Sequence, residues 1–260
     1  MRIMVLGAGS IVPTASRFSS GFYVEAGERR MLVDCGPGVL EKMRRLAISP
    51  FKIDTLLLTH FHIDHVSDLF PLLKMRAFTP EGLPSRAPER LRILGSQGLK
   101  RFLATLIDNN EFFSYVKTLM RYETYCSVEE VEPWRVYDLG GARLVSAPVA
   151  HDGGVAYRLD YEGVSIAFSG DTAFSENIIR LAEGVDLLVH ECSFPSERLV
   201  GKHVSEVELA KIVSLVRPKI VLVSHLYPVW EPEEFRIVEA IEKSHQCRVI
   251  VARDCLELTV

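Results

Sequence analysis

The sequence predicts an α/β protein built from two related β/α halves, and three observations support this prediction. Short runs rich in β-branched and apolar residues alternate with amphipathic stretches along the 260 residues. Hydrophobic residues make up 48% of the chain and charged residues 25%, which is ordinary globular composition. Each half contains a buried strand that ends at a histidine, in the segments TLLLTH and IVLVSH. We therefore expect one domain over residues 1–260 in which the two halves meet at a single site.

The first half is expected to begin with four strands, at residues 2–6, 21–26, 30–34 and 55–58. A turn at Gly36–Pro37–Gly38 leads into a helix around 39–47. The strand at 55–58 is an unbroken apolar run, which is typical of a strand buried on both faces. Residues 74–133 are expected to be a mostly helical or irregular cover inserted over this scaffold.

Strands and helices alternate again through the second half, which begins at Trp134. The expected helices lie at 175–182, 205–215 and 233–243. The expected strands lie at 134–139, 142–149, 155–160, 164–169, 186–190, 219–224, 248–252 and 256–260.

Charge, hydropathy and cysteine content exclude several classes of protein. Thirty basic and 34 acidic residues leave a net charge of −4, so any nucleic acid must be held by a local patch. No apolar run approaches the roughly 18–20 residues that span a bilayer. Gly7 and Gly9 stand where a signal peptide would need its apolar centre. Five cysteines without a CxxC pair argue against a disulfide framework. We expect a cytoplasmic protein with no membrane partner.

The segment HFHIDH at residues 60–65 is the first candidate for chemistry. His60 and His62 are two apart on an extended segment, so their side chains point the same way and can bind one ion. The chain then turns into a helix, which brings Asp64 and His65 round to face a second ion. The alternative is a solvated histidine-rich loop.

Further candidate ligands stand at the ends of three predicted strands of the second half. They are His151, Asp171 and His225. Together with the first cluster they make five histidines and two aspartates, a number that fits two ions bridged by a carboxylate. The histidine-rich set favours Zn²⁺, with Mn²⁺ and Fe as alternatives. Asp34, at the end of another strand, is expected to orient a ligand or a turn.

In these motifs the chain resembles the metallo-β-lactamase-fold hydrolases over nearly its whole length. The likeness rests on the Asp34-Cys35-Gly36 turn, the HxHxDH segment and the Ser169–Thr172 segment, in the order of that family. It implies a four-layer αββα sandwich of two pseudo-symmetric halves. It also implies the ligands of two ions: His60, His62 and His151 for one, Asp64, His65 and His225 for the other, and Asp171 bridging both.

Within that superfamily the chain is most similar to tRNase Z, the transfer-RNA 3′-processing endonuclease, and to related phosphodiesterases. The segment LLVHECSF at 187–194 resembles the HEAT segment of that family, and KHVS at 202–205 resembles the segment with its proton-donating histidine. The resemblance implies that Glu191 orients His203, which acts as general acid for a ribose leaving group. The implied nucleophile is a metal-bridging hydroxide, and Asp64 is expected to take its proton.

The chain departs from the tRNase Z pattern at several positions. Ala15 and Phe18 stand where the PxKxRN segment has lysine and asparagine, and only 19 residues separate His151 from Asp171, too few for an inserted tRNA-gripping arm. We therefore expect RNA or a small phosphodiester as substrate, with transfer RNA in doubt. The basic segment 74–101 could contact phosphates in place of that arm, or it could be a solvated face. Its basic residues are Lys74, Arg76, Arg86, Arg90, Arg92, Lys100 and Arg101.

The sequence also allows other functions. The same centre could hydrolyse a small carbonyl substrate, a thioester or a lactone, which would not need the His203 acid. A diiron oxidoreductase is disfavoured because 260 residues leave no room for a flavin domain. A non-catalytic metal scaffold is disfavoured because structural sites are closed and mononuclear. Dimerisation is expected from the resemblance alone. Phe112, Phe113 and Tyr115 are expected in the core rather than as base-stacking platforms.

Overall fold

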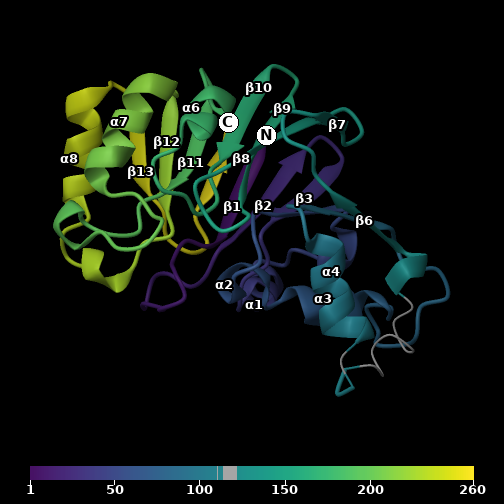
Figure 1. Cartoon of the computed structure of the whole chain (residues 1–260). Coiled ribbons are helices and arrows are strands. Elements are labelled where there is room, and N and C mark those ends of the chain that lie inside the picture. The colour runs from purple at the N-terminus through teal and green to yellow at the C-terminus, as the bar shows by residue number, and fades with distance from the viewer. Residues whose placement is uncertain (110, 114–121) are drawn as a thin grey trace.

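Two sheets packed face to face form the centre of the molecule (Figure 1). The computed structural model describes residues 1–109, 111–113 and 122–260. Within these residues the first sheet runs, in spatial order, through β14 (Glu257–Thr259), β1 (Arg2–Gly7), β2 (Gly21–Ala26), β3 (Arg29–Val33), β4 (Thr55–Leu58), β5 (Leu91–Gly95) and β6 (Cys126–Glu130). The second runs through β13 (Arg248–Val251), β12 (Ile220–Ser224), β11 (Leu187–Glu191), β10 (Val164–Phe168), β9 (Val155–Tyr161), β8 (Arg143–Pro148) and β7 (Val136–Asp138).

Helices cover the outer face of each sheet. Beside the first sheet lie α1 (Val39–Arg45), α2 (Ile63–Val66), α3 (Leu69–Arg76) and α4 (Leu99–Leu103), and beside the second lie α6 (Glu176–Leu181), α7 (Glu206–Val216) and α8 (Phe235–Ser244). Short 3₁₀ turns occur at Pro50–Lys52, Tyr122–Thr124, Ser196–Arg198 and Pro228–Trp230, and a π turn at Ala104–Asp108. The predicted four-layer αββα arrangement is confirmed.

Successive side chains of the central strands point to opposite faces of the sheet and pack into different apolar layers. Leu57 of β4 and Leu222 of β12 belong to the apolar cluster between the two sheets. Their neighbours Leu58 and Val223 belong to the clusters under the outer helices. Burial of such a side chain contributes roughly 1.5–3 kcal/mol. The layers are therefore fixed by alternation within strands that are apolar on both faces.

The strands that deliver functional side chains are parallel to their neighbours. β3 pairs with β4 in parallel, and β10, β11 and β12 pair in parallel as well. The carboxyl ends of parallel strands lie at the same edge of a sheet, where ligands of open α/β sheets commonly bind. Asp34, His60, Asp171, Glu191 and His225 all stand at or within three residues of such an end.

The expected cover over residues 74–133 is wrong in part. This stretch contributes β5, which pairs in parallel with β4, and β6, which pairs in parallel with β5, so that both extend the first sheet. Phe112 and Phe113 are exposed, at 76% and 41%, rather than in the core, and Tyr115 lies outside the described residues. The described part of the chain holds no helix with the length and apolar character of a bilayer span.

The C-terminal segment returns to the first half. β14 pairs antiparallel with β1, with Arg2 opposite Thr259. Nearby, the buried Arg17 guanidinium donates to the Ala252 carbonyl at 2.7 Å and to the Glu234 carboxylate at 2.6 Å. These contacts close the N-terminal loop over the C-terminal segment, next to the edge that carries the functional residues.

Candidate metal centre

Local structure explains how the HFHIDH segment presents its side chains. His60 follows β4 by two residues, and His62 keeps an extended backbone as the residue before α2. Asp64 and His65 lie within α2 and are both buried. The extended-then-helical path predicted from the sequence is therefore present. It brings the second pair of side chains beside the first, with the rings of His60 and His65 4.1 Å apart.

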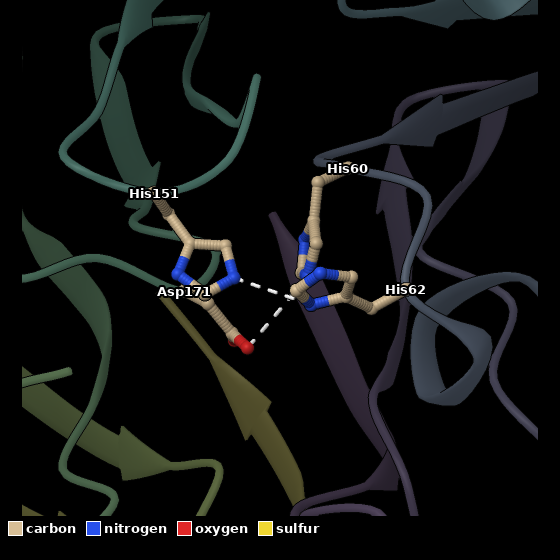
Figure 2. A group of neighbouring side chains, drawn as sticks. All are labelled: His60, His62, His151 and Asp171. Carbon is tan, nitrogen blue, oxygen red and sulfur yellow. Dashed lines mark hydrogen bonds and ion pairs between the residues drawn. The ribbon is translucent and has the colours of Figure 1, made fainter. Parts of the chain in front are cut away.

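Three histidines and an aspartate from three segments form the first group of candidate ligands (Figure 2). Their ligand atoms all lie within 4.8 Å of one another in the group His60, His62, His151 and Asp171. Nε2 of His151 is 3.2 Å from Nδ1 of His62, and Nε2 of His60 is 3.7 Å from Oδ2 of Asp171. The group joins both halves, because β4 and β10 belong to different sheets.

A second group lies beside the first and consists of Asp64, His65 and His225, again within 4.8 Å. Nε2 of His225 is 3.3 Å from Oδ2 of Asp64. The carboxylate of Asp171 faces this group as well, with Oδ2 3.3 Å from Nε2 of His225 and Oδ1 3.4 Å from Nε2 of His65. Asp171 thus stands between the two groups, where a bridging ligand would be.

The residues present fit a divalent metal ion. Nε2 of His60 and Nε2 of His65 are buried and make no hydrogen bond among the described residues. An unsatisfied buried polar atom costs about 1–3 kcal/mol, and a bound cation would remove this cost. Imidazole nitrogens and carboxylate oxygens together are the donor set that divalent transition metals take.

Burial and neighbouring charges set the protonation of the ligands. Burial lowers the pKa of His60 to about 2, which keeps its imidazole neutral and ready to bind a cation. Burial would raise the pKa of Asp64, but the hydrogen bond with His225 and the neighbouring imidazoles outweigh it and bring that pKa to about 2. Burial would also lower the pKa of His65, but the charges of Asp171 and Asp34 outweigh it and raise that pKa. Metal binding must therefore displace a proton from His65.

Asp34 contacts the candidate ligands of the first half, as expected of a residue that orients them. Its Oδ2 is 2.7 Å from Nδ1 of His65, and Oδ1 accepts from the Thr59 backbone N–H at 2.8 Å. The Thr59 hydroxyl, at 2.9 Å from Oδ2, is in turn 3.1 Å from Nδ1 of His60. Asp34 and His225 both have left-handed backbones, with φ of 58° and 56°. Such conformations in non-glycine residues concentrate at functional sites.

The predicted acid and its orienter lie at the edge of the second group. Nδ1 of His203 is 2.9 Å from Oε1 of Glu191, and His203 has a ligand atom within 4.8 Å of Asp171 and His225. Burial would lower the pKa of His203, but the hydrogen bond and charge of Glu191 outweigh it and raise that pKa. The loop that carries His203 ends at a capping box, in which Ser205 and Glu208 start α7.

Sequence reasoning missed several residues around this pair. The hydroxyl of Ser193 lies 3.0 Å from Nδ1 of His225, and the rings of Phe194 and Tyr227 stack at 4.3 Å beside His203. Ser193 and Phe194 stand in the segment compared with HEAT, so that resemblance could have pointed to them. Tyr227 carried no signal of its own, because only folding brings it to this edge.

The basic segment 74–101 does not act as one surface. Arg76 is buried and donates to four backbone carbonyls, which makes it a structural residue. Arg92 pairs with Glu129 at 2.7 Å. The net charge that this segment offers to a ligand is therefore smaller than the sequence count implied.

Comparisons with known proteins agree with this geometry. Residues 1–242 match the family described as anti-Pycsar protein Apyc1. Ribonuclease Z of Mycobacterium avium (strain 104) is 31% identical over 200 residues, which cover 73% of this chain and 69% of that protein.

Two crystal structures share the fold at low sequence identity. The metallo-β-lactamase fold protein YhfI of Bacillus subtilis is 21% identical, with a TM-score of 0.81 and coverage of 99% of this chain and 98% of that one. The short form of human tRNase Z is 18% identical, with a TM-score of 0.78 and coverage of 100% and 99%.

Proposed function

The chain belongs to the family described as anti-Pycsar protein Apyc1 and to the ribonuclease Z family, and on this premise we propose that it hydrolyses phosphodiester bonds with two bound metal ions. The resemblance inferred from the sequence motifs is thereby confirmed. The observation that carries the proposal is the position of Asp171 between two groups of candidate ligands, next to the pair of the buried Glu191 and the part-buried His203.

The proposed ligands divide between the two groups. His60, His62 and His151 would hold one ion, Asp64, His65 and His225 the other, and Asp171 both. Zn²⁺ is proposed because five of the seven donors are imidazoles, with Mn²⁺ or Fe as alternatives. When bound, such ions supply Lewis acidity to phosphoryl oxygens and lower the pKa of water to about 7.

The protein's own residues would handle the protons. Asp64 is ionised at neutral pH and faces the site, so it can accept the proton of the attacking water. Nδ1 of His203 is engaged with Glu191, which leaves Nε2 to give a proton to the departing oxygen as the bond from phosphorus to that oxygen breaks. A ribose oxygen is a poor leaving group unless protonated.

We propose RNA or a small phosphodiester as the substrate, acted on in the cytoplasm by a single domain of residues 1–260. A side-by-side assay of the metal-loaded protein tests the reaction class. The substrates are bis-p-nitrophenyl phosphate, a cyclic nucleotide, a 3′-extended tRNA and a thioester. Turnover of at least one phosphodiester is expected. Turnover of the thioester alone would overturn the proposal in favour of the carbonyl hydrolase.

A further inference from the structure

Each half of the protein has one buried carboxylate that contacts two histidines in the same way. In the first half Asp34 contacts His65 directly, and it reaches His60 through the hydroxyl of Thr59. In the second half Glu191 contacts His203 directly at 2.9 Å. It reaches His225 through the hydroxyl of Ser193.

The Ser193 hydroxyl has one proton to donate and two lone pairs to accept with. Its Oγ is 2.5 Å from Oε2 of Glu191, which can only accept, so the hydroxyl proton goes there. Nδ1 of His225 lies 3.0 Å from the same Oγ and Nδ1 of His203 lies 3.1 Å from it. The two lone pairs of the hydroxyl can accept from both rings, so Nδ1 of His225 must carry a proton and donate it. This leaves the lone pair of His225 on Nε2, which faces Asp64 and Asp171.

Thr59 obeys the same accounting. Its hydroxyl donates to Asp34 and can therefore only accept from Nδ1 of His60 at 3.1 Å, so the lone pair of His60 lies on the buried Nε2. Thr59 packs closely against Gly170, because a Cβ at Gly170 would lie 2.9 Å from Cβ of Thr59. Thr59 is 1% exposed and Ser193 is fully buried, so water does not compete for either hydroxyl.

From this geometry we propose that Thr59 and Ser193 are paired positioning residues. The hydroxyl of each donates to a carboxylate and accepts from the Nδ1–H of one ligand histidine. It thereby fixes the tautomer that binds metal at Nε2. Thr59 serves the first group through His60, and Ser193 serves the second group through His225. The inference rests on the proposed metal ligands but not on which substrate is hydrolysed. Partners of this kind commonly contribute 10–100-fold to metal affinity.

Metal affinity is the first test, measured by competition of the loaded protein against a chelator. Thr59→Val replaces the hydroxyl by a methyl group of equal size, and Ser193→Ala removes the other hydroxyl. Each is expected to weaken one binding step by about 10–100-fold. Thr55→Val and Ser146→Ala are matched controls, because both residues are buried and neither contacts a candidate ligand. The Thr55 hydroxyl donates to Asp54, and the Ser146 hydroxyl donates to the Glu132 carbonyl. Affinity equal to that of the unmodified protein in both test variants would overturn the proposal.

A direct readout does not depend on the folding of any variant. Long-range ¹H–¹⁵N correlation of the imidazole nitrogens in the Zn²⁺-loaded wild-type protein should find His60 and His225 protonated at Nδ1. Protonation at Nε2 of either residue would refute the relay to that residue.

Kinetics separates this role from that of the acid. The Ser193 hydroxyl also lies 3.1 Å from Nδ1 of His203, but Glu191 contacts that nitrogen at 2.9 Å and still does so in Ser193→Ala. This variant should therefore lose activity on alkoxide-leaving and nitrophenolate-leaving diesters in equal proportion at limiting Zn²⁺. Loss on the alkoxide-leaving diester alone would assign Ser193 to the acid and contradict the ligand relay. If no diester is turned over at all, the proposed function fails while the affinity and tautomer results still stand.

Discussion

Oε1 of Glu191 lies 2.9 Å from Nδ1 of His203, and the two side chains are 1% and 13% exposed. Water is largely excluded from this contact, so the carboxylate acts on the imidazole with little screening. The pKa of His203 is raised in spite of its burial. Protonated His203 therefore persists to higher pH than a free histidine, as a general acid requires.

Removal of the acid should lower kcat only on substrates whose leaving group needs a proton. His203→Ala is expected to lower kcat by roughly 10²-fold or more on a diester with an alkoxide leaving group. On bis-p-nitrophenyl phosphate the same variant should keep much of its activity, with metal content unchanged. Equal losses on both substrates would show that His203 binds substrate or supports the fold.

The pH dependence follows from the same pair. Activity on the alkoxide-leaving diester should fall as pH rises through the raised pKa of His203, because the proton is then lost. Glu191→Gln removes the charge that raises this pKa, so the falling limb should move to lower pH. The profile of kcat against pH for both proteins measures the shift. An unmoved limb would mean that another group is the acid.

Asp171 is expected to decide metal content. The purified protein should hold two metal ions per chain, and Asp171→Ala should lose both metal and activity, because its carboxylate faces both groups. Elemental analysis measures this, with Asp160→Ala as a control aspartate outside the site. One tightly held ion together with a fully active Asp171→Ala protein would refute the dinuclear assignment.

Arg76 should matter for stability rather than for nucleic acid. Its guanidinium donates to the carbonyls of Pro50, Phe51, Glu89 and Arg90. Arg76→Met removes all four of these hydrogen bonds from a buried guanidinium, so we expect the free energy of unfolding to fall by about 2–4 kcal/mol. Arg86→Met, at an exposed position, should change it by less than about 0.5 kcal/mol. Urea denaturation of the three proteins makes the comparison.

Transfer RNA should be a poor substrate compared with a small phosphodiester or a short RNA. Ala15 and Phe18 replace the lysine and asparagine of the tRNase Z pattern, and 19 residues between His151 and Asp171 leave no inserted arm. Ratios of kcat/KM on the substrates measure the preference. Efficient cleavage of precursor tRNA next to its discriminator base would contradict this expectation.

The ends of the strands were the most predictable part of the molecule. The runs TLLL and IVLVS are apolar on both faces, which only a doubly covered parallel strand allows, and each leads to a polar residue. β5 and β6 were missed because the pairing of β5 with β4 and of β6 with β5 is long-range. Residues 91–95 follow a proline-rich loop, and the run 126–130 is only partly buried, so neither shows a clear period.

The same limit applies to the site. His60, His62 and Asp64 could be chosen from spacing, and Asp34 from its place after a strand. The hydroxyls of Thr59 and Ser193 could not be chosen this way. Their importance depends on which carboxylate and which imidazole meet them in space, and buried serines and threonines are common.

The left-handed backbones of Asp34 and His225 place the two residues under opposing selection. A side chain costs about 1 kcal/mol more than glycine in this conformation. At Asp34 the carboxylate offsets this cost because it accepts the buried Thr59 backbone N–H, so selection for folding alone would favour glycine at position 225 more than at position 34. Natural proteins stand close to a stability threshold, where such a difference affects abundance. In a library evolved only for soluble expression, codon 225 should therefore drift toward glycine sooner than codon 34, and selection restored for catalysis should reverse that drift.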